Sequence, residues 1–282
     1  MNYPFIDFHE ILTKFSRIDY HALMSAPSGK QTTLLQDWVL EVQTFTLLSL
    51  KSILNFFRKP FYLKEIFEQM DIVGVGSLSI ASLTCFFTGA VLALQTSNTL
   101  SSFGAVGYTG QLVSVSLVRE LGPVLTAVVV AGRVGSGIAS ELGSMLISEQ
   151  INAMRTLGTD PIKKLVTPRV VACTTMVPVL TVTADLVGIM GGFVVAYFFL
   201  GISPSLYLTS AYDRLTYTDF VYGLAKPPVF GFLIAIVGCY SGLSTYGGTE
   251  GVGRSTTQSV VSSMVLIFIS NFFITRILLV IL

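Results

Sequence analysis

Ionisable side chains lie inside stretches of the sequence that are otherwise apolar enough to cross a membrane, and the candidates for chemistry among them are Arg119, Glu120, Asp185 and Lys226. A charge at membrane depth costs from about 3 to more than 10 kcal/mol, so each needs an opposite charge or a polar ligand. Neighbouring helix positions differ by about 100°, so Arg119 and Glu120 need not pair with each other. We therefore expect Asp185 and Lys226 to be their partners.

Charged groups of this kind usually mark the path of a substrate or ion. The alternative is a set of ion pairs that only fixes the helices relative to one another. Asn271, a lone polar group deep in the last apolar stretch, is predicted to hydrogen-bond another helix.

A second group of candidates lies toward the end of the first apolar stretch, at spacings compatible with one helix face. A lipid-facing or core stripe would show the same pattern, so a cavity lining is one of two interpretations. These residues are Leu92, Gln95, Thr99, Leu100 and Phe103.

No catalytic, metal or cofactor site is predicted in this chain. The segment APSGKQTT superficially resembles a phosphate loop, but Lys30 is followed by Gln31 instead of Ser or Thr, so the nucleotide-binding pattern fails. Ser136 as a hydrolase nucleophile would lack a histidine base, because His9 and His21 both lie in the N-terminal segment.

Composition identifies an integral membrane protein. The 282 residues are 52% hydrophobic and only 12% charged, whereas soluble domains carry about 25% charged residues. A net charge of +1 argues against a nucleic-acid partner, which would need a clustered basic surface. Cys85, Cys173 and Cys239 each lie in an apolar run and are expected to be buried free thiols.

The predicted fold is an all-α membrane protein with an N-terminal interfacial helix and five transmembrane helices. Residues 1–33 form a cytoplasmic segment, 34–70 an amphipathic region with basic and aromatic anchors at the membrane surface, and 71–282 the membrane domain. A spanning helix that carries Lys51 is the alternative for the amphipathic region. Residues 201–219 are expected to form a polar loop and 246–254 a glycine-rich turn. The spans are placed at about 72–98, 108–140, 170–200, 220–245 and 255–282.

Residues 141–169 separate the second and third spans and form the longest charged connection between spans. Apolar residues at helical spacing predict a short amphipathic helix over 141–158, which ends at Gly158. Asp160 and Pro161 are typical of the start of another helix. Two short helices between spans make a docking surface for a partner.

Orientation follows from the basic residues of the short loops. Residues 142–169 contain Arg155, Lys163, Lys164 and Arg169, the turn at 99–112 contains none, and 201–219 contains only Arg214. The positive-inside rule then places 141–169 and the N-terminus in the cytoplasm and the C-terminus on the opposite side. Small residues repeat at four-residue spacing in three spans and predict close helix packing. They are Gly135, Ala139 and Gly143; Gly188 and Gly192; and Gly238 and Gly242.

The stretch from Val118 to Ala172 resembles the MlaE (YrbE) family of ABC-transporter permeases. The motifs RELGP, AGRVGS, ELGSM, EQINAM, LGTDP and LVTPR occur there in the family's order, and ADLVGIMGG, GLAKPPVFGF and GGTEGVGRSTTQSVV continue the similarity. The resemblance runs from about Asp71 to the C-terminus.

The resemblance implies a homodimeric permease of the bacterial inner membrane that transports phospholipid, in support of outer-membrane lipid asymmetry. Its implied partners are an ABC ATPase that binds ATP and Mg, a periplasmic MCE-domain protein and a small STAS-domain protein. Arg119, Glu120 and Lys226 match charged family positions near the cavity, whereas Asn271 replaces a frequent Asp. The coupling residues it implies are Glu141, Met145, Glu149, Gln150, Ile151, Met154, Arg155 and Gly158.

The competing function is an ion-coupled secondary transporter that would use Asp185 or Glu120 as its proton site, because intramembrane carboxyl groups serve in proton relays.

Overall fold

The computed structural model of the chain describes residues 34–56 and 62–281. Within those residues the regular structure is entirely helical, which confirms the predicted all-α fold. Five helical stretches in the described part are long and apolar enough to cross a membrane. They are Leu63–Ser101, Val106–Ile147, Ile162–Phe198, Tyr217–Leu243 and Gly248–Ile281.

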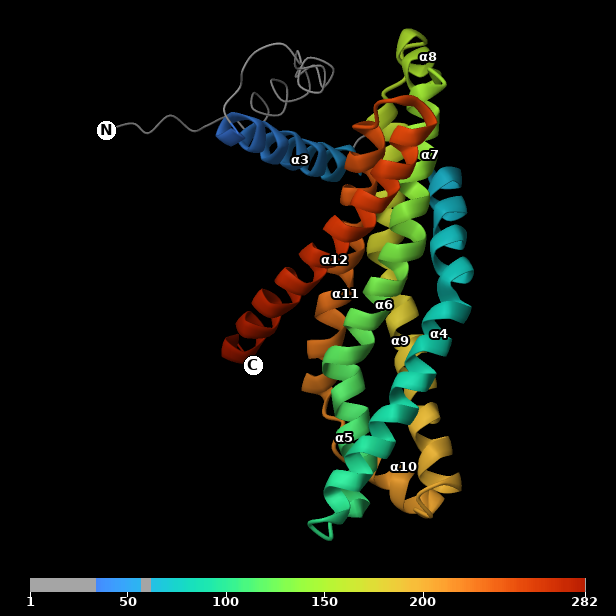
Figure 1. Ribbon diagram of the computed structural model, residues 1–282, viewed down its shortest axis with the longest axis vertical. Helices are drawn as coiled ribbons and strands as arrows, with labels where there is room; N and C mark the ends of the chain where they lie inside the picture. The colour runs from blue at the N-terminus through green and yellow to red at the C-terminus, as the bar shows by residue number, and fades with distance from the viewer. Residues whose placement is uncertain (1–33, 57–61, 282) are drawn as a thin grey trace, which may run out of the picture.

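The spans form an elongated bundle, and α3 (Leu34–Phe56) lies across one end of it (Figure 1). Leu48 of α3 is fully buried in the core, and the Phe45 ring meets the Tyr240 ring edge-on at 5.9 Å. A crosswise helix with one buried face is the arrangement expected of an interfacial helix. The N-terminal segment 1–33 lies outside the described residues.

The first span, α4 (Leu63–Ser101), begins earlier than predicted. Residues 63–70, which we placed in the interfacial region, form its first two turns. No proline or glycine interrupts 63–71, and Lys64 pairs with Glu68 on an exposed surface at 3.8 Å. The charges therefore extend the helix beyond the apolar span instead of ending it.

The second span is one continuous rod with two wider turns. It consists of a 3₁₀ turn (Val106–Tyr108), α5 (Thr109–Ser116), a π-helical turn (Leu117–Leu121), α6 (Gly122–Val130), a second π-helical turn (Ala131–Gly135) and α7 (Ser136–Ile147). Pro123 lies inside this rod, directly after the first π-helical turn, and has no N–H to donate to the carbonyl of Arg119 one turn earlier. The rod runs seven residues beyond the predicted end at 140.

The third span begins with a π-helical turn (Ile162–Val166) that continues into α9 (Thr167–Phe198). Its start is capped as predicted, because the Ile162 N–H donates to Asp160 Oδ1 at 3.0 Å. The second short helix that we expected after Pro161 is thus the beginning of the span itself. Nothing breaks the helix between Ile162 and Thr167, so the two are continuous.

Residues 201–219, predicted as a loop, contain α10 (Pro204–Asp213). Ser203 caps it, and Pro204 occupies the first helical turn, a Ser-Pro start signal that the loop assignment overlooked. The buried Tyr207 hydroxyl donates to Ile189 O at 3.3 Å, and burial raises the pKa of this phenol.

The last two spans are α11 (Tyr217–Leu243) and α12 (Gly248–Ile281). The predicted glycine-rich turn is shorter than 246–254, since α12 already begins at Gly248. Gly247 and Gly248 have φ of 87° and 70°, a left-handed conformation that glycine adopts at little cost. α12 runs obliquely to the other spans (Figure 1), and the Tyr222 hydroxyl of α11 donates to Leu278 O near its C-terminal end at 2.9 Å.

Close packing of small residues joins the central helices. A Cβ at Gly188 would lie 3.0 Å from Cys85 O, and one at Gly238 would lie 3.1 Å from Gly135 O. The predicted small-residue faces therefore lie at real helix contacts, where backbones approach closely. All three cysteines are buried free thiols, as expected.

Candidate functional site

A charge cluster lies where the first π-helical turn of the second span faces α11 and α12. The turn Leu117–Leu121 carries both Arg119 and Glu120. A π-helical turn accommodates an extra residue, which frees a backbone carbonyl from the regular helical pattern and changes the direction of side chains. Such turns are frequent at functional sites.

Lys226 of α11 occupies the centre of this cluster and is fully buried. Its ammonium lies 2.6 Å from Glu120 Oε1 and donates to Arg119 O at 2.8 Å. The predicted pairing of Lys226 with the 119–120 charges is therefore confirmed. The π-helical turn supplies both partners, one from a side chain and one from the backbone.

Arg119 pairs with Asp219, not with Asp185 as the sequence led us to expect. Its Nε and Nη2 both contact Asp219 Oδ1 at the start of α11, and its guanidinium lies over the Tyr222 ring, 5.2 Å from the centroid. Asp219 also accepts hydrogen bonds from the backbone N–H and hydroxyl of Thr216, in a capping box. The α11 cap therefore fixes the acid that orients Arg119.

α12 completes the cluster from the other side. Asn271 Nδ2 donates to Glu120 Oε2 at 3.3 Å, and Thr275 Oγ1 donates to Glu120 Oε1 at 3.2 Å. The predicted interhelical bond of Asn271 is present. Glu120 thus receives one ammonium and two neutral donors, yet its side chain stays 42% exposed and that of Arg119 40% exposed.

Sequence reasoning missed Asp219, Tyr222 and Thr275. Asp219 was assigned to a loop, although Thr216-x-x-Asp219 is a capping-box pattern and positions 219, 222 and 226 share a helix face. Those two signals together would have placed Asp219 and Tyr222 beside Lys226.

Asp185 of α9 lies outside the charge cluster. The residue is 8% exposed and its carboxyl contacts Gly122 of α6. Its Oδ1 has no hydrogen-bond partner within the described structure. The expectation that it compensates Arg119 is wrong, because Asp219 takes that place. Asp185 instead lines a cavity between α9, α10 and α11.

The predicted stripe at the end of α4 has mixed surroundings. Leu92 packs partly buried against a small core with Ala93 and Leu117, whereas Gln95, Thr99 and Phe103 are exposed and Leu100 is half-buried. The cavities at Asp185, on α12 and between α5 and α10 are lined by other residues. That the stripe lines a substrate cavity stays a prediction.

The docking segment differs from the single helix predicted over 141–158. The end of α7 reaches Ile147, Glu149 turns the chain in a left-handed conformation with φ of 60°, and α8 (Gln150–Thr156) follows. A left-handed residue cannot continue an α-helix, so two helices replace one. Gly158, with φ of 76°, ends the segment as expected.

The side chains of this segment divide into buried and exposed sets. Ile151 is fully buried, Met145 and Met154 are half-buried, and Glu141 pairs with Arg169 of α9 at 2.8 Å. These residues attach the segment to the bundle. The residues open to a partner are Glu149, Gln150, Arg155 and Leu157, the last 82% exposed.

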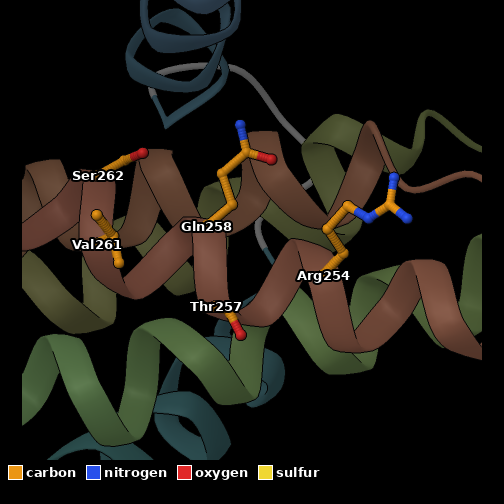
Figure 2. A pocket seen from close by; sticks show the side chains of 5 residues that line it. All are labelled: Arg254, Thr257, Gln258, Val261 and Ser262. Atoms are coloured by element: carbon orange, nitrogen blue, oxygen red, sulfur yellow. The ribbon is translucent and has the colours of Figure 1, made fainter.

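The start of α12 carries a further open cavity of about 450 Å³. It is lined by Arg254, Thr257, Gln258, Val261 and Ser262. Figure 2 shows that Gln258 and Ser262 point to one side of the helix and Thr257 to the opposite side. Arg254, Gln258 and Ser262 are four residues apart, so α12 presents a polar stripe on this side of the cavity.

Comparisons with known proteins agree on one family. A family model described as Permease MlaE matches residues 66–277, which include the whole charge cluster. A protein of Rickettsia typhi named "Probable ABC transporter permease protein" is 46% identical over 237 residues, 84% of this chain and 92% of the relative.

More distant organisms contain similar proteins. A Synechocystis protein with the same descriptive name is 48% identical over 208 residues, 74% of this chain and 79% of that protein. The protein named TRIGALACTOSYLDIACYLGLYCEROL 1, chloroplastic, of Arabidopsis thaliana is 37% identical over 220 residues, 78% of this chain and 63% of its own length.

Proposed function

The chain belongs to the MlaE permease family of ABC transporters, and we propose that it forms the path by which an ATP-driven complex moves phospholipid into or out of the membrane. As an ABC permease it works with an ATPase partner. ATP and Mg would be bound by that partner, so this chain would supply no hydrolytic residue. The family gives no support to the ion-coupled alternative.

The observation that carries the phospholipid proposal is the charge cluster at membrane depth. Asp219 engages the Nε and Nη2 edge of Arg119, which leaves the Nη1 edge of the guanidinium available. Arginine binds phosphate through charge-assisted hydrogen bonds, and partial exposure of this side chain gives a headgroup access. Apolar helix faces beside the cluster would accept acyl chains. The Arabidopsis relative also bears the name of a glycolipid.

A second copy of the chain would close the site. Arg119 and Glu120 stay partly exposed although Asn271 and Thr275 of α12 contact Glu120. Charges left facing hydrocarbon are costly, so a polar or protein surface must cover them. The least buried span in the described structure is α12, which makes it the natural contact for that second copy.

The proposed complex has a defined orientation in the bacterial inner membrane. The ATPase would bind the cytoplasmic turn at Glu149, Gln150, Arg155 and Leu157, and the N-terminus would lie on the same side. The C-terminus and α10 would face the periplasm, where an MCE-domain carrier would exchange lipid with the permease. A STAS-domain protein would join through the ATPase, and outer-membrane asymmetry is the proposed role.

Reconstitution tests this function directly. The permease and its ATPase are placed in vesicles with a fluorescent phospholipid, and transfer to an external carrier is followed with and without ATP. We expect ATP-dependent transfer, and a loss of at least ten-fold in the Arg119→Ala variant together with less phospholipid co-purified. Lys64→Ala, on the exposed surface of α4, is the matched control and should leave both unchanged.

Two results would contradict the proposal. Transfer that proceeds without ATPase but collapses with a proton gradient would identify an ion-coupled transporter. Phospholipid counts by mass spectrometry that are equal in Arg119→Ala and the unmodified protein would remove the headgroup role of Arg119.

A further inference from the structure

A cavity of about 360 Å³ lies between α9, α10 and α11, within the range of about 300–1,000 Å³ of small-ligand sites. Its lining is mostly apolar, and Asp185 is the single acidic or basic residue in it. The apolar lining includes Val182, Leu186, Ile189, Leu208, Phe220 and Leu224.

This cavity adjoins the charge cluster but shares no residue with it. α11 carries the cluster on positions 219, 222 and 226, whereas positions 220, 223 and 224 line the cavity together with Val118 of the π-helical turn. The cavity therefore presents Asp185, and not Arg119 or Lys226, to a ligand.

The Asp185 carboxyl is left without compensation. Its Oδ1 is buried against Gly122 of α6 and has no hydrogen-bond partner among the described residues. A buried carboxyl in an apolar setting is either protonated or paired with a cation. The lining contains no lysine or arginine, so a cation that pairs with Asp185 in this cavity would come from a ligand.

The lining includes apolar side chains that are exposed on the spans α9 and α11. Leu186 is 62% exposed, and Val182 and Leu224 are also exposed, so this side of the cavity would face lipid. A ligand that enters from this side must be soluble in the membrane. An anionic headgroup would be repelled by Asp185, whereas an ammonium would pair with it.

We propose that this cavity binds a membrane amphiphile with a primary ammonium group, which pairs with Asp185 while an apolar chain lies against α9 and α11. Phosphatidylethanolamine and long-chain alkylamines share this chemistry. Binding at this site does not require ATP-driven transfer, so failure of the function proposed above would not exclude it, and its own failure would not exclude that function.

Photolabelling of the purified full chain in nanodiscs tests the site. The probes are phosphatidylethanolamine, phosphatidylglycerol and a long-chain amine, each with a diazirine in the chain, and labelled peptides are located by mass spectrometry. We expect the ethanolamine lipid or the amine to label residues 181–189 and 220–224 at least five-fold more than phosphatidylglycerol. Comparing the two amine probes distinguishes the sources.

Two variants make the result specific. Asp185→Asn keeps the shape of the side chain and should abolish the preference for the amine probes. Leu186→Trp should fill the mouth and reduce all labelling without changing Asp185, whereas Met190→Trp, also exposed on α9 but outside the lining, should leave labelling intact. Arg119→Ala should leave this labelling unchanged.

The inference is overturned if phosphatidylglycerol labels these peptides as strongly as the amine probes, or if Asp185→Asn keeps the preference. Absence of labelling at residues 181–189 and 220–224 with every probe would also overturn it. Labelling of the isolated chain that disappears when the partner subunits assemble would show that a protein helix fills the cavity, and would replace the lipid assignment.

Discussion

Lys226 shows how strongly one residue can hold the site together. Its ammonium is fully buried and contacts Glu120 Oε1 and Arg119 O. Lys226→Met would leave the Glu120 carboxylate without its cation. Because Glu120 is 42% exposed, the expected cost is that of a hydrogen bond to a charged group, about 1.5–3 kcal/mol. We expect a loss of this size in unfolding by sodium dodecyl sulfate in mixed micelles, followed by circular dichroism.

The control for this prediction is Lys64→Met, which breaks the exposed Lys64–Glu68 pair and should cost about 0–1 kcal/mol. The double variant Lys226→Met with Glu120→Gln should recover part of the loss, because no carboxylate is then left unpaired. A Lys226→Met protein as stable as the unmodified chain would show that the pair does not support the bundle.

For individual residues, the sequence identified the charged side chains of the cluster but not all of their partners. Composition was enough to select Arg119, Glu120 and Lys226, since charges in apolar runs are rare. The choice of Asp219 over Asp185 depended on the start of α11 and on which faces of α9 and α11 meet the second span. The capping-box spacing marks the start of α11, but the faces that meet the second span are not encoded in local spacing.

Among the elements, the close contact of α4 and α9 depends on glycine. A Cβ at Gly191 would lie 2.1 Å from the backbone oxygen of Phe86, so Gly191→Ala must push the helices apart. We expect a destabilisation of about 1–3 kcal/mol in the same unfolding assay, as for other overpacked cores.

Gly137→Ala is the matched control in another span. No atom lies within 4 Å of a Cβ at Gly137, so the added methyl group meets no neighbour. Alanine loses less conformational entropy than glycine when a helix forms, so the free energy of unfolding of this variant should rise by about 0.5–1 kcal/mol. Equal effects of the two substitutions would rule out close packing as the reason for Gly191.

The cytoplasmic turn gives the second prediction at the scale of elements. Glu149 and Arg155 are exposed on either side of α8, away from the buried Ile151 that attaches this helix to the bundle. Reversing both charges with Glu149→Lys and Arg155→Glu should therefore reduce ATPase co-purification at least five-fold without changing stability. Glu250→Lys, exposed at the start of α12, is the control. An unchanged amount of bound ATPase would contradict the docking role.

Sequence periodicity predicted the number and order of the spans but not their internal turns. The π-helical turns Leu117–Leu121, Ala131–Gly135 and Ile162–Val166 each add one residue to a helical turn without changing composition. Which helical turn takes up the extra residue depends on the helices that pack against the second and third spans. For the same reason the bend at Glu149 was not visible in an amphipathic pattern that continues through it.

For the whole molecule, the path of α12 is the feature least determined by the sequence. Its composition shows that it spans a membrane but not what covers its outer side. Its C-terminal half runs obliquely to the other spans (Figure 1) and touches them through Asn271, Thr275 and Leu278. A charge cluster that is partly exposed beside this helix requires a further surface. We therefore expect the complete site to form only when two copies of the chain meet along α12.

Cysteine crosslinking examines this contact. Val261, Val265, Phe268 and Phe272 are exposed along one side of α12, so a contact along α12 should bring at least one of these positions close to the same position in a second copy when each is replaced singly by cysteine. The native cysteines are buried and should stay inert. We expect copper-phenanthroline to give a covalent dimer of twice 30.5 kDa from at least one position, but none from Val91→Cys on exposed α4. Equal crosslinking at Val91, or none along α12, would mean that lipid rather than a second copy covers this helix.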